Sequence, residues 1–503
     1  MSVSFVNGAS VSLDAIPTLK FEDFAAELSA GAPRILAYWR LSDGRVACVR
    51  GNPATKRLEA FATPFETYRP LTSRVPAIHR FEAELLGADE DVQPVTPLKG
   101  EAAHEVAVGP VHAGVIEPGH FRFQCLGEDV HSLEIRLGYQ HRGAEKLIVE
   151  ATTDARRLAL AETVAGDTSI AATLAATKAL SIPLSNSTSD LNLLLELERI
   201  ANHVGDLGAL SGDVAYLPTA SFCGRIRGEY LNMTAEFVGN RFGHHALLAK
   251  APTAETYKKV LNWFVRTEHE LFHALDLLFS EAGAVERFEG TGKVPRELAQ
   301  EIGLVGMAGR ASGLTCDSRI DFPMADETIA ETLVATAYEP TGDVLSRARQ
   351  RYEELKVSHE IVRRLLAAGP VPQCVSPAAD SVPQCVSPAA DSVPQCVSPA
   401  ADSVPQCVSP AAGNSHPAEG VLGNAAGETH RGTTLTVAAV EAWRGELVHL
   451  AVRDADGRLA QYKIFDPSYH NWFGLAQALK GEQISNFPIC NKSFNLSYCG
   501  VDR

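Results

Sequence analysis

The sequence predicts an α+β fold in which a small N-terminal α/β module precedes an antiparallel sheet packed on a mainly helical bundle. Two patterns support this prediction. Residues 106–137 alternate apolar and polar side chains, as strands of a half-buried sheet do, and the chain from there to residue 366 is mostly helical in pattern. With 503 residues, of which 45% are apolar and 21% charged, the chain has room for about two to four domains.

The N-terminal module is expected to span residues 1–95. Two apolar segments, 34–39 and 45–50, flank an Asp-Gly turn and predict a pair of strands, and residues 79–86 predict a short helix. A polar join containing proline follows.

The core is expected to begin with residues 106–366. Its strands include 121–125 and 133–137, separated by a Gly-Glu-Asp turn. The clearest helix covers 190–210; it is apolar nearly all round, as in the interior of a bundle, and Ser189 or Asp190 is expected to cap it. Further helices are expected at 253–282, at 295–302 with Pro295 in the first turn, and at 343–366, where one face carries charged residues.

Residues 371–429 interrupt this pattern. The unit Val-Pro-Gln-Cys-Val-Ser-Pro-Ala-Ala-Asp-Ser starts at Val371, Val382, Val393 and Val404, and its two prolines exclude helix. We expect a disordered, polyproline-like insertion. A four-cysteine metal trap is the alternative, although each thiol is eleven residues from the next.

The last segment, 433–503, is expected to complete the core. Strands are predicted at 433–437, 440–452 and 459–464, with a hairpin turn at Asp454-Ala-Asp-Gly457. The ending from Phe487 to Val501 is too apolar for a solvated tail, so it ought to be buried with Cys490, Cys499, Asp502 and Arg503. Buried charge needs partners, because an unpaired one costs several kcal/mol.

Composition excludes several classes of function. A net charge of −16 and a pI near 5.5 argue against nucleic-acid binding. No stretch approaches the roughly 18 to 20 apolar residues of a membrane span, and the N-terminus does not resemble a signal peptide, so a cytoplasmic location is expected. The six cysteines outside the repeat are scattered, without a Cys-x-x-Cys pair, and are expected to be mostly buried apolar residues.

Three polar segments are candidates for chemistry. The first places His141, Arg142 and Glu145 at a predicted sheet-to-helix junction, where a buried Glu could relay protons; a structural ion pair is the alternative. The second carries Arg310, Asp317, Arg319 and Asp321 in a predicted loop, and the third is Asp466 to Trp472. Each of the last two could equally be a solvated loop.

Together these segments resemble one family, in the right order. It comprises the large subunits of membrane-bound, energy-converting nickel-iron hydrogenases and formate hydrogenlyase, and the large quinone-site subunit of respiratory complex I. The N-terminal module resembles a shortened version of the smaller complex I subunit that is often fused ahead of it. The resemblance covers residues 108–123, 138–147, 195–210, 289–292, 303–323, 342–344 and 440–503.

The resemblance implies a nickel-iron hydrogenase large-subunit-like fold and assigns roles to residues. Glu145 matches the family's proton-gating carboxylate, accompanied by His141, Arg142, Arg310, Asp317, Arg319, Asp502 and Arg503. In the hydrogenases two Cys-x-x-Cys pairs hold nickel and iron, because soft thiolates suit these metals. Here Val164 and Asp167 occupy the first pair, and Ser497 and Gly500 the second, with Cys499 one residue off. A nickel-iron centre is therefore expected to be absent.

The quinone site of the family is also altered. His112 and His120 are available in the loop that supplies its quinone-binding His, but the matching position is Pro118, and the position of its Tyr is Ala165. No Gly-x-Gly-x-x-Gly follows a strand, so NAD binding is implied by resemblance alone.

The resemblance thus implies an oxidoreductase subunit, active only within a complex, on the cytoplasmic face of the inner membrane. The complex would couple electron transfer from NAD(P)H or ferredoxin to a quinone-type acceptor with proton or cation translocation. The implied partners are a small iron-sulfur subunit, which would carry the iron-sulfur clusters, a ferredoxin-like subunit and antiporter-like membrane subunits. A non-catalytic scaffold and a hydrogenase with displaced ligands are the alternatives.

Overall fold

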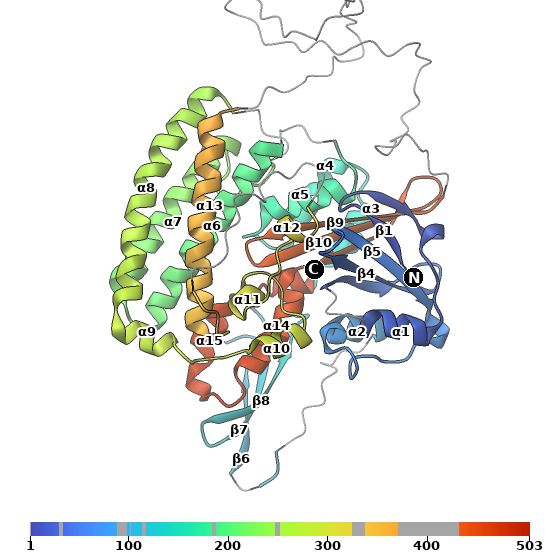
Figure 1. Cartoon of the computed structure of the whole chain (residues 1–503), viewed down its shortest axis with the longest axis horizontal. Coiled ribbons are helices and arrows are strands. Elements are labelled where there is room, and N and C mark those ends of the chain that lie inside the picture. Colours follow the sequence, from blue (N-terminus) through green and yellow to red (C-terminus); the bar gives the residue numbers. More distant parts are fainter. Residues whose placement is uncertain are drawn as a thin grey trace, which may run out of the picture.

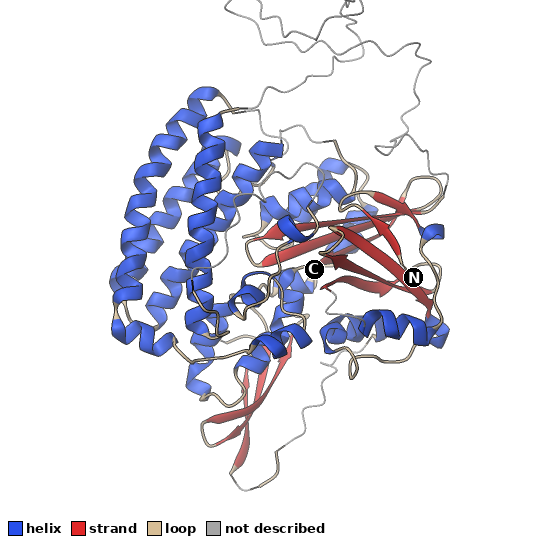
Figure 2. Cartoon of the chain, viewed as in Figure 1, coloured by secondary structure: helices blue, strands red, loops and turns tan. Residues whose placement is uncertain are grey.

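The computed structural model describes residues 2–29, 34–87, 98–100, 102–112, 117–183, 188–246, 252–323, 338–370 and 432–503. The repeat at 371–429 lies outside these residues, so its expected disorder stays a prediction. Figure 2 shows long helices on the left, two groups of strands on the right and a third group of strands at the bottom, which confirms the α+β class.

The N-terminal residues form a four-stranded antiparallel sheet with the order β1 (Val3–Phe5), β5 (Arg57–Pro64), β4 (Arg45–Asn52) and β3 (Arg34–Arg40). The helices α1 (Phe21–Ser29) and α2 (His79–Leu86) pack beside it. Both predicted strands and the predicted helix are confirmed. The apolar side chains of β3 and β4 are buried, and they are part of a hydrophobic core that is continuous with the rest of the described chain.

A second antiparallel sheet joins the two ends of the chain. Its order is β11 (Leu459–Phe465), β10 (Gly445–Arg453), β9 (Thr434–Ala442) and β2 (Ser10–Ser12), so an N-terminal strand completes a C-terminal sheet. The hairpin at 454–457 is confirmed. The predicted strand 440–452 is wrong, because the chain reverses at Trp443 and Arg444.

Glycine makes this reversal possible. Gly445 has φ +139°, and its Cα lies so close to Gly306 that a Cβ at Gly306, where φ is +59°, would approach it to 2.2 Å. Neither position accommodates a side chain without a backbone shift. This close approach brings the turn after β9 against the helix that carries Arg310.

The third sheet, β6 (Ala103–Val108), β7 (His120–Leu126) and β8 (Asp129–Arg136), confirms the strands predicted between 106 and 137. Figure 1 shows it projecting from one edge of the molecule. Phe121 and Phe123 are fully buried, and both rings contact Phe487, so the sheet is anchored on the C-terminal segment.

The helical bundle consists of α6 (Thr188–Asp213), α7 (Leu217–Val238), α8 (Ala254–Ser280) and α13 (Val344–Ala368), which lie side by side (Figure 1). Asp343 caps α13 by accepting a hydrogen bond from Ser346 N at 2.7 Å. The predicted cap of α6 is wrong, because Ser189 and Asp190 lie inside the helix. The charged residues of α13 are divided between interior and surface: Arg347, Arg351 and Glu354 are buried, whereas Arg349 is exposed.

Short helices connect these layers. The segment around Arg310 was predicted as a loop, but it contains the two short helices α11 and α12. Helix α12 begins where the Asp317 side chain accepts a hydrogen bond from the Arg319 N–H at 3.0 Å. Pro295 precedes its helix as the cap residue and does not lie in the first turn. None of the described helices is long and apolar enough to cross a bilayer. The short helices are α3 (Ala144–Glu150), α4 (Asp154–Glu162), α5 (Ser169–Ala179), α9 (Ala282–Phe288), α10 (Arg296–Glu301), α11 (Gly306–Ala311), α12 (Ser318–Asp321), α14 (Pro467–Ala478), α15 (Phe487–Phe494) and α16 (Cys499–Asp502).

Candidate functional site

The C-terminal residues are buried, as the sequence predicts, and they bind the loop before α3. The Asp502 carboxylate accepts the N–H groups of Gly138 at 2.7 Å and Gln140 at 2.8 Å. His141 Nδ1 lies 2.7 Å from the main-chain oxygen of Asp502. Asp502 and Arg503 are 6% and 8% exposed. The tail is thus a structural partner of the segment that carries Glu145.

Arg503 and Lys463 hold two carboxylates between them. Arg503 Nη1 donates to Glu145 at 2.8 Å, and its Nη2 donates to Glu84 at 2.5 Å. Lys463 Nζ contacts the same carboxylates, at 2.9 Å from Glu145 and 2.7 Å from Glu84. The Ile464 N–H also donates to Glu145, at 2.9 Å. We call Glu84, Glu145, Lys463 and Arg503 the terminal cluster.

Ion pairing keeps Glu84 and Arg503 of this cluster charged. Burial opposes ionisation of Glu84, but Arg503 and Lys463 outweigh it and hold its pKa well below the usual range. Burial likewise opposes the charge of Arg503, and the carboxylates of Glu145 and Glu84 raise its pKa. The cluster therefore connects the N-terminal module, which supplies Glu84 from α2, to the end of the chain.

Two of the predicted residues lie outside the cluster. His141 and Arg142 are exposed, although their segment contacts Asp502. The Arg142 guanidinium donates to the carbonyl oxygens of Thr163 at 2.8 Å and Val164 at 2.9 Å. Arg142 thus positions the turn after α4.

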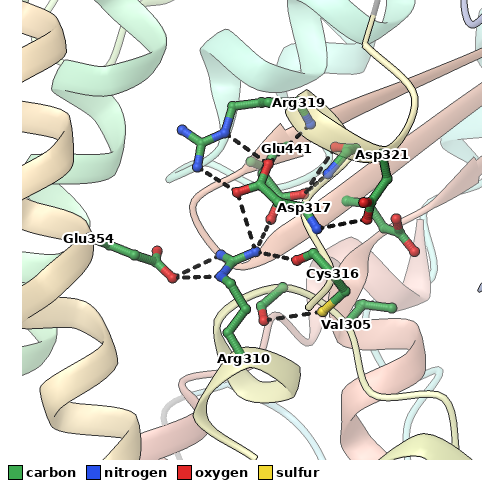
Figure 3. A network of polar contacts seen from close by, with 12 residues as sticks. Val305, Arg310, Cys316, Asp317, Arg319, Asp321, Glu354 and Glu441 are labelled. Carbon is green, nitrogen blue, oxygen red and sulfur yellow. Dashed lines mark hydrogen bonds and ion pairs between the residues drawn. The ribbon is translucent and has the colours of Figure 1, made fainter. Parts of the chain in front are cut away.

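A second group of charges lies at the heart of the fold (Figure 3). Arg310 on α11 donates to Glu354 on α13 at 2.9 Å and to Glu441 on β9 at 2.7 Å. Its Nη1 also donates to the carbonyl oxygen of Cys316 at 2.7 Å. One guanidinium therefore ties three elements together.

Arg319 extends this array. It binds both oxygens of Asp317, at 3.0 and 2.7 Å, and donates to Glu196 on α6 at 2.9 Å. Glu196 also accepts a hydrogen bond from Arg199 at 3.1 Å. We call Arg310, Asp317, Arg319, Glu354 and Glu441 the central cluster.

Pairing keeps the central cluster charged despite its burial. Burial opposes ionisation of Glu354, but Arg310 and the hydrogen bond from His203 hold its pKa well below the usual range. Desolvation also works against Asp317, whose pKa is lowered by Arg319. Removing one member of such a buried pair typically costs about 3–5 kcal/mol, because the other charge loses its partner.

The two clusters remain separate. Within the described part of the chain, no hydrogen bond or ion pair joins a member of the terminal cluster to a member of the central cluster. The predicted residues therefore form two sites. One lies at the C-terminal end of the chain, and the other lies between α6, α11, α13 and β9.

The four positions of the hydrogenase metal ligands hold no thiolate. Asp167 makes a bidentate pair with Arg444, with both N–O distances 2.8 Å. A Cβ at Gly500 would lie 2.7 Å from Asp466 Oδ2 and from Ser497 Oγ, so no larger side chain fits there. The Arg444 guanidinium also stacks 3.8 Å from the centre of the Trp443 ring. A salt bridge thus occupies one of the positions that the resemblance assigns to the sulfur ligands.

The remaining donors do not fit a nickel-iron centre. Cys499 Sγ lies 3.6 Å from Ser497 Oγ, and burial raises its pKa to about 11, which favours the thiol over the thiolate. Cys490 lies elsewhere, packed against Gly292. Among the described residues no three His, Cys, Asp or Glu side chains are grouped to hold a metal ion.

The two histidines predicted for a quinone loop are not part of either cluster. His120 begins β7, and its Nδ1 lies 3.2 Å from the Gly109 carbonyl oxygen, while His112 is exposed. Ala165, at the position of the family's Tyr, is buried. The quinone assignment stays a prediction.

The sequence analysis missed Glu198 on α6. Its carboxyl accepts the N–H groups of Ile170 at 2.8 Å and Ala171 at 3.3 Å, at the start of α5. The side chain borders a small cavity of about 20 Å³ beside Asp167. Burial raises its pKa to about 8, against the lowering by the two N–H groups. A carboxyl in a helix predicted to be apolar nearly all round was the available signal.

Glu84 and Glu441 were also missed. Glu84 is one of three charged residues in the sequence of α2, and Glu441 is the second residue of the predicted strand 440–452. Their partners Arg503 and Arg310 are 419 and 131 residues away in the chain, so no local pattern could have selected them.

Comparisons with known proteins agree with this architecture. Residues 213–503 match the family model described as respiratory-chain NADH dehydrogenase, 49 kDa subunit. The C/D subunit of the NADH-quinone oxidoreductase of Bacteroides thetaiotaomicron is 29% identical over 281 residues, which are 54% of this chain and 52% of that protein. The chain thus matches about half the length of this relative.

Two further relatives align over more of the chain. The membrane-bound hydrogenase subunit alpha of Pyrococcus furiosus is 23% identical over 415 residues, or 79% of this chain and 87% of that protein. The NADH-quinone oxidoreductase subunit 4 of Thermus thermophilus is 26% identical over 413 residues, which are 79% of this chain and 93% of that protein.

A solved structure shares the fold. It is the structure of a membrane-bound sulfane sulfur reductase, an archaeal respiratory membrane complex, in which one chain superposes with a TM-score of 0.62 at 20% identity, covering 82% of this chain and all of that one. The family match spans more than half of the chain, and relatives of both the complex I and the hydrogenase type align with it. The chain therefore belongs to the family of the 49 kDa subunit of respiratory-chain NADH dehydrogenase.

Proposed function

We propose that this chain is a peripheral subunit of a membrane-associated oxidoreductase complex that works without a nickel-iron centre. In this complex, electron transfer from NAD(P)H or ferredoxin to a quinone-type acceptor drives proton or cation translocation. The observation that carries the proposal is the Asp167–Arg444 pair at a position of the metal ligands, together with two intact charge clusters.

The physical argument concerns charge in a low-dielectric interior. A change of charge near a buried carboxyl shifts its pKa strongly, because interactions between charges are weakly screened there. Glu145 lies between Arg503 and Lys463, so a change of charge at this position alters the balance of four charged groups. The names of the relatives, which are respiratory and hydrogenase subunits, support the redox context.

The proposed partners are those that the family resemblance implies. They are a small iron-sulfur subunit, a ferredoxin-like subunit and antiporter-like membrane subunits, and the proposed location is the cytoplasmic face of the inner membrane. Affinity purification of the intact complex under mild conditions, with identification of the neighbouring subunits, tests this. Recovery of the chain alone, without a redox subunit, would contradict the proposal.

The Glu145→Gln variant tests the coupling role. We expect cation transport by the purified, reconstituted complex to fall while the complex stays assembled, because the amide cannot release a proton. Glu84→Gln is the matched control: it binds the same Arg503 and Lys463 but is not at the position of the relay residue. Unchanged transport in Glu145→Gln, or an equal loss in both variants, would refute the relay.

A non-catalytic scaffold is the second candidate, favoured by the closed pairing of Glu145 with three donors. It predicts normal assembly and normal activity of the complex for both Gln variants. A hydrogenase with displaced ligands is the third, and elemental analysis decides it: nickel at near-unit stoichiometry would overturn the metal-free proposal.

A further inference from the structure

A cavity of about 240 Å³ lies where the N-terminal module meets the core. Arg34 and Ile35 of β3 line it from the module, and Arg296 of α10, Cys316 and His470 of α14 line it from the core. Arg296 is exposed, so the cavity opens to the surface on the α10 side. No residue of the terminal cluster lines it.

His470 contributes a polar group to the wall of this cavity. The residue is 6% exposed, and no hydrogen bond joins either ring nitrogen to another described residue. Burial, reinforced by repulsion from Arg34 and His79, lowers its pKa to about 3, so the ring is neutral and offers one donor and one acceptor. The ring nitrogens are not among the fully enclosed unpaired atoms, so they remain open to a hydrogen-bonding occupant of the cavity.

Two guanidinium groups and no Asp or Glu stand in the described lining of the cavity. The Nη groups of Arg34 are already bonded to Asp321 and Glu446, so Arg34 offers only its Nε, which is buried without a partner among the described residues. Arg296 has no acidic partner within the described part of the chain. An anion would therefore meet the full charge of Arg296 and one remaining donor of Arg34, and guanidinium groups are suited to carboxylates and phosphates.

Size and apolar lining restrict the occupant further. The cavity holds the equivalent of about eight waters at about 30 Å³ each. Ile35, Leu304 and Leu314 supply an apolar wall. A drug-sized ligand would be too large, since such sites are usually about 300 Å³ or more. A short carbon skeleton with one or two anionic groups matches both the charge and the volume.

We propose that this cavity is a binding site for a compact organic anion, a short carboxylate or a small phosphate ester, at the joint between the N-terminal module and the core. Arg34 and Arg296 bind the anionic group, and His470 hydrogen-bonds the remainder. Arg34 also binds Glu446, and Glu446 lies opposite Glu441 in the β9–β10 ladder. A ligand bound to Arg34 is therefore connected to the central cluster through these two residues.

Calorimetric titration of the full chain, alone or in its complex, tests the site. The probes are succinate, inorganic phosphate and the neutral butane-1,4-diol. We expect saturable binding of at least one anion with a Kd below about 1 mM and none of the diol. Succinate binding alone identifies a carboxylate site, and phosphate binding alone identifies a phosphate site.

Two variants connect binding to the residues. Arg296→Gln is expected to weaken anion binding at least about ten-fold, because a charge-assisted hydrogen bond is lost. Arg287→Gln, an exposed arginine on α9 that does not line the cavity, is the matched control and should bind normally. His470→Phe keeps the ring that packs on Phe81 but removes both nitrogens, and should also weaken binding. No saturable anion binding, equal binding of the diol, or equal effects of Arg296→Gln and Arg287→Gln would overturn the proposal.

Discussion

Glu198 provides the sharpest test of the electrostatics, because its environment is strongly perturbed and its replacement is conservative. The carboxyl is 8% exposed, and burial raises its pKa from 4.5 to about 8. The Glu198→Gln variant keeps an oxygen that can accept the N–H groups of Ile170 and Ala171. The variant therefore removes the titratable carboxyl but can keep both hydrogen bonds to the start of α5.

The sign follows from proton binding. A carboxyl whose pKa is raised by folding binds its proton more tightly in the folded state, so its stability contribution is complete below pH 4.5 and is lost as the pH rises through 8. Since each pKa unit corresponds to about 1.36 kcal/mol, the loss amounts to about 5 kcal/mol in total. The stability of Glu198→Gln relative to the wild type should therefore rise with pH and level off above pH 8.

Urea unfolding of both proteins, followed by circular dichroism between pH 5 and pH 9, measures this difference. Glu286→Gln on the exposed surface of α9 is the control, for which no trend is expected. An infrared band of a protonated carboxylic acid at neutral pH, present in the wild type and absent from Glu198→Gln, gives a second readout. A stability difference that does not change with pH would refute the reasoning.

The clusters yield three further predictions. Arg310→Met should destabilise the fold by about 3–5 kcal/mol in thermal unfolding, because buried Glu354 and Glu441 lose their shared cation, and Arg310→Lys should recover part of that loss. Arg503→Met should cost less, about 1–3 kcal/mol, since Glu84 and Glu145 are partly exposed and retain Lys463; adding Glu84→Gln, which leaves Lys463 paired with Glu145, should restore part of this loss, and no recovery would show that the loss is not electrostatic. The lowered pKa of Glu84 stabilises the fold above pH 4.5 and this contribution is lost on acidification, so Glu84→Gln should narrow the difference in melting temperature between pH 7 and pH 3; an unchanged difference would contradict the charge pairing.

Local patterns predicted most of the regular structure. The strands 34–40 and 45–52, the helix 79–86 and the meander 103–136 follow from alternation, helical spacing and turn residues, which act over a few neighbours. The misses have tertiary causes. The reversal at Trp443 and Arg444 depends on the contact between Gly445 and Gly306, which lie far apart in sequence.

The site was predicted in part for the same reason. Motif order selected Glu145, Arg310, Asp317, Arg319, Asp502 and Arg503, and the structure places all six in or against a charge cluster. It could not select Glu84, Glu198 or Glu441, whose burial and partners depend on packing. It also could not show that His141 and Arg142 are exposed.

The sequence by itself therefore determined the α+β class, the family and the identity of the side chains at the former metal-ligand positions, because these depend on residue type, order and spacing. Only the tertiary structure decided which charges meet. An ion pair forms when packing brings two side chains within about 4 Å in a low-dielectric interior, and the pairs Asp167–Arg444, Glu84–Arg503 and Arg310–Glu441 each join residues more than one hundred positions apart.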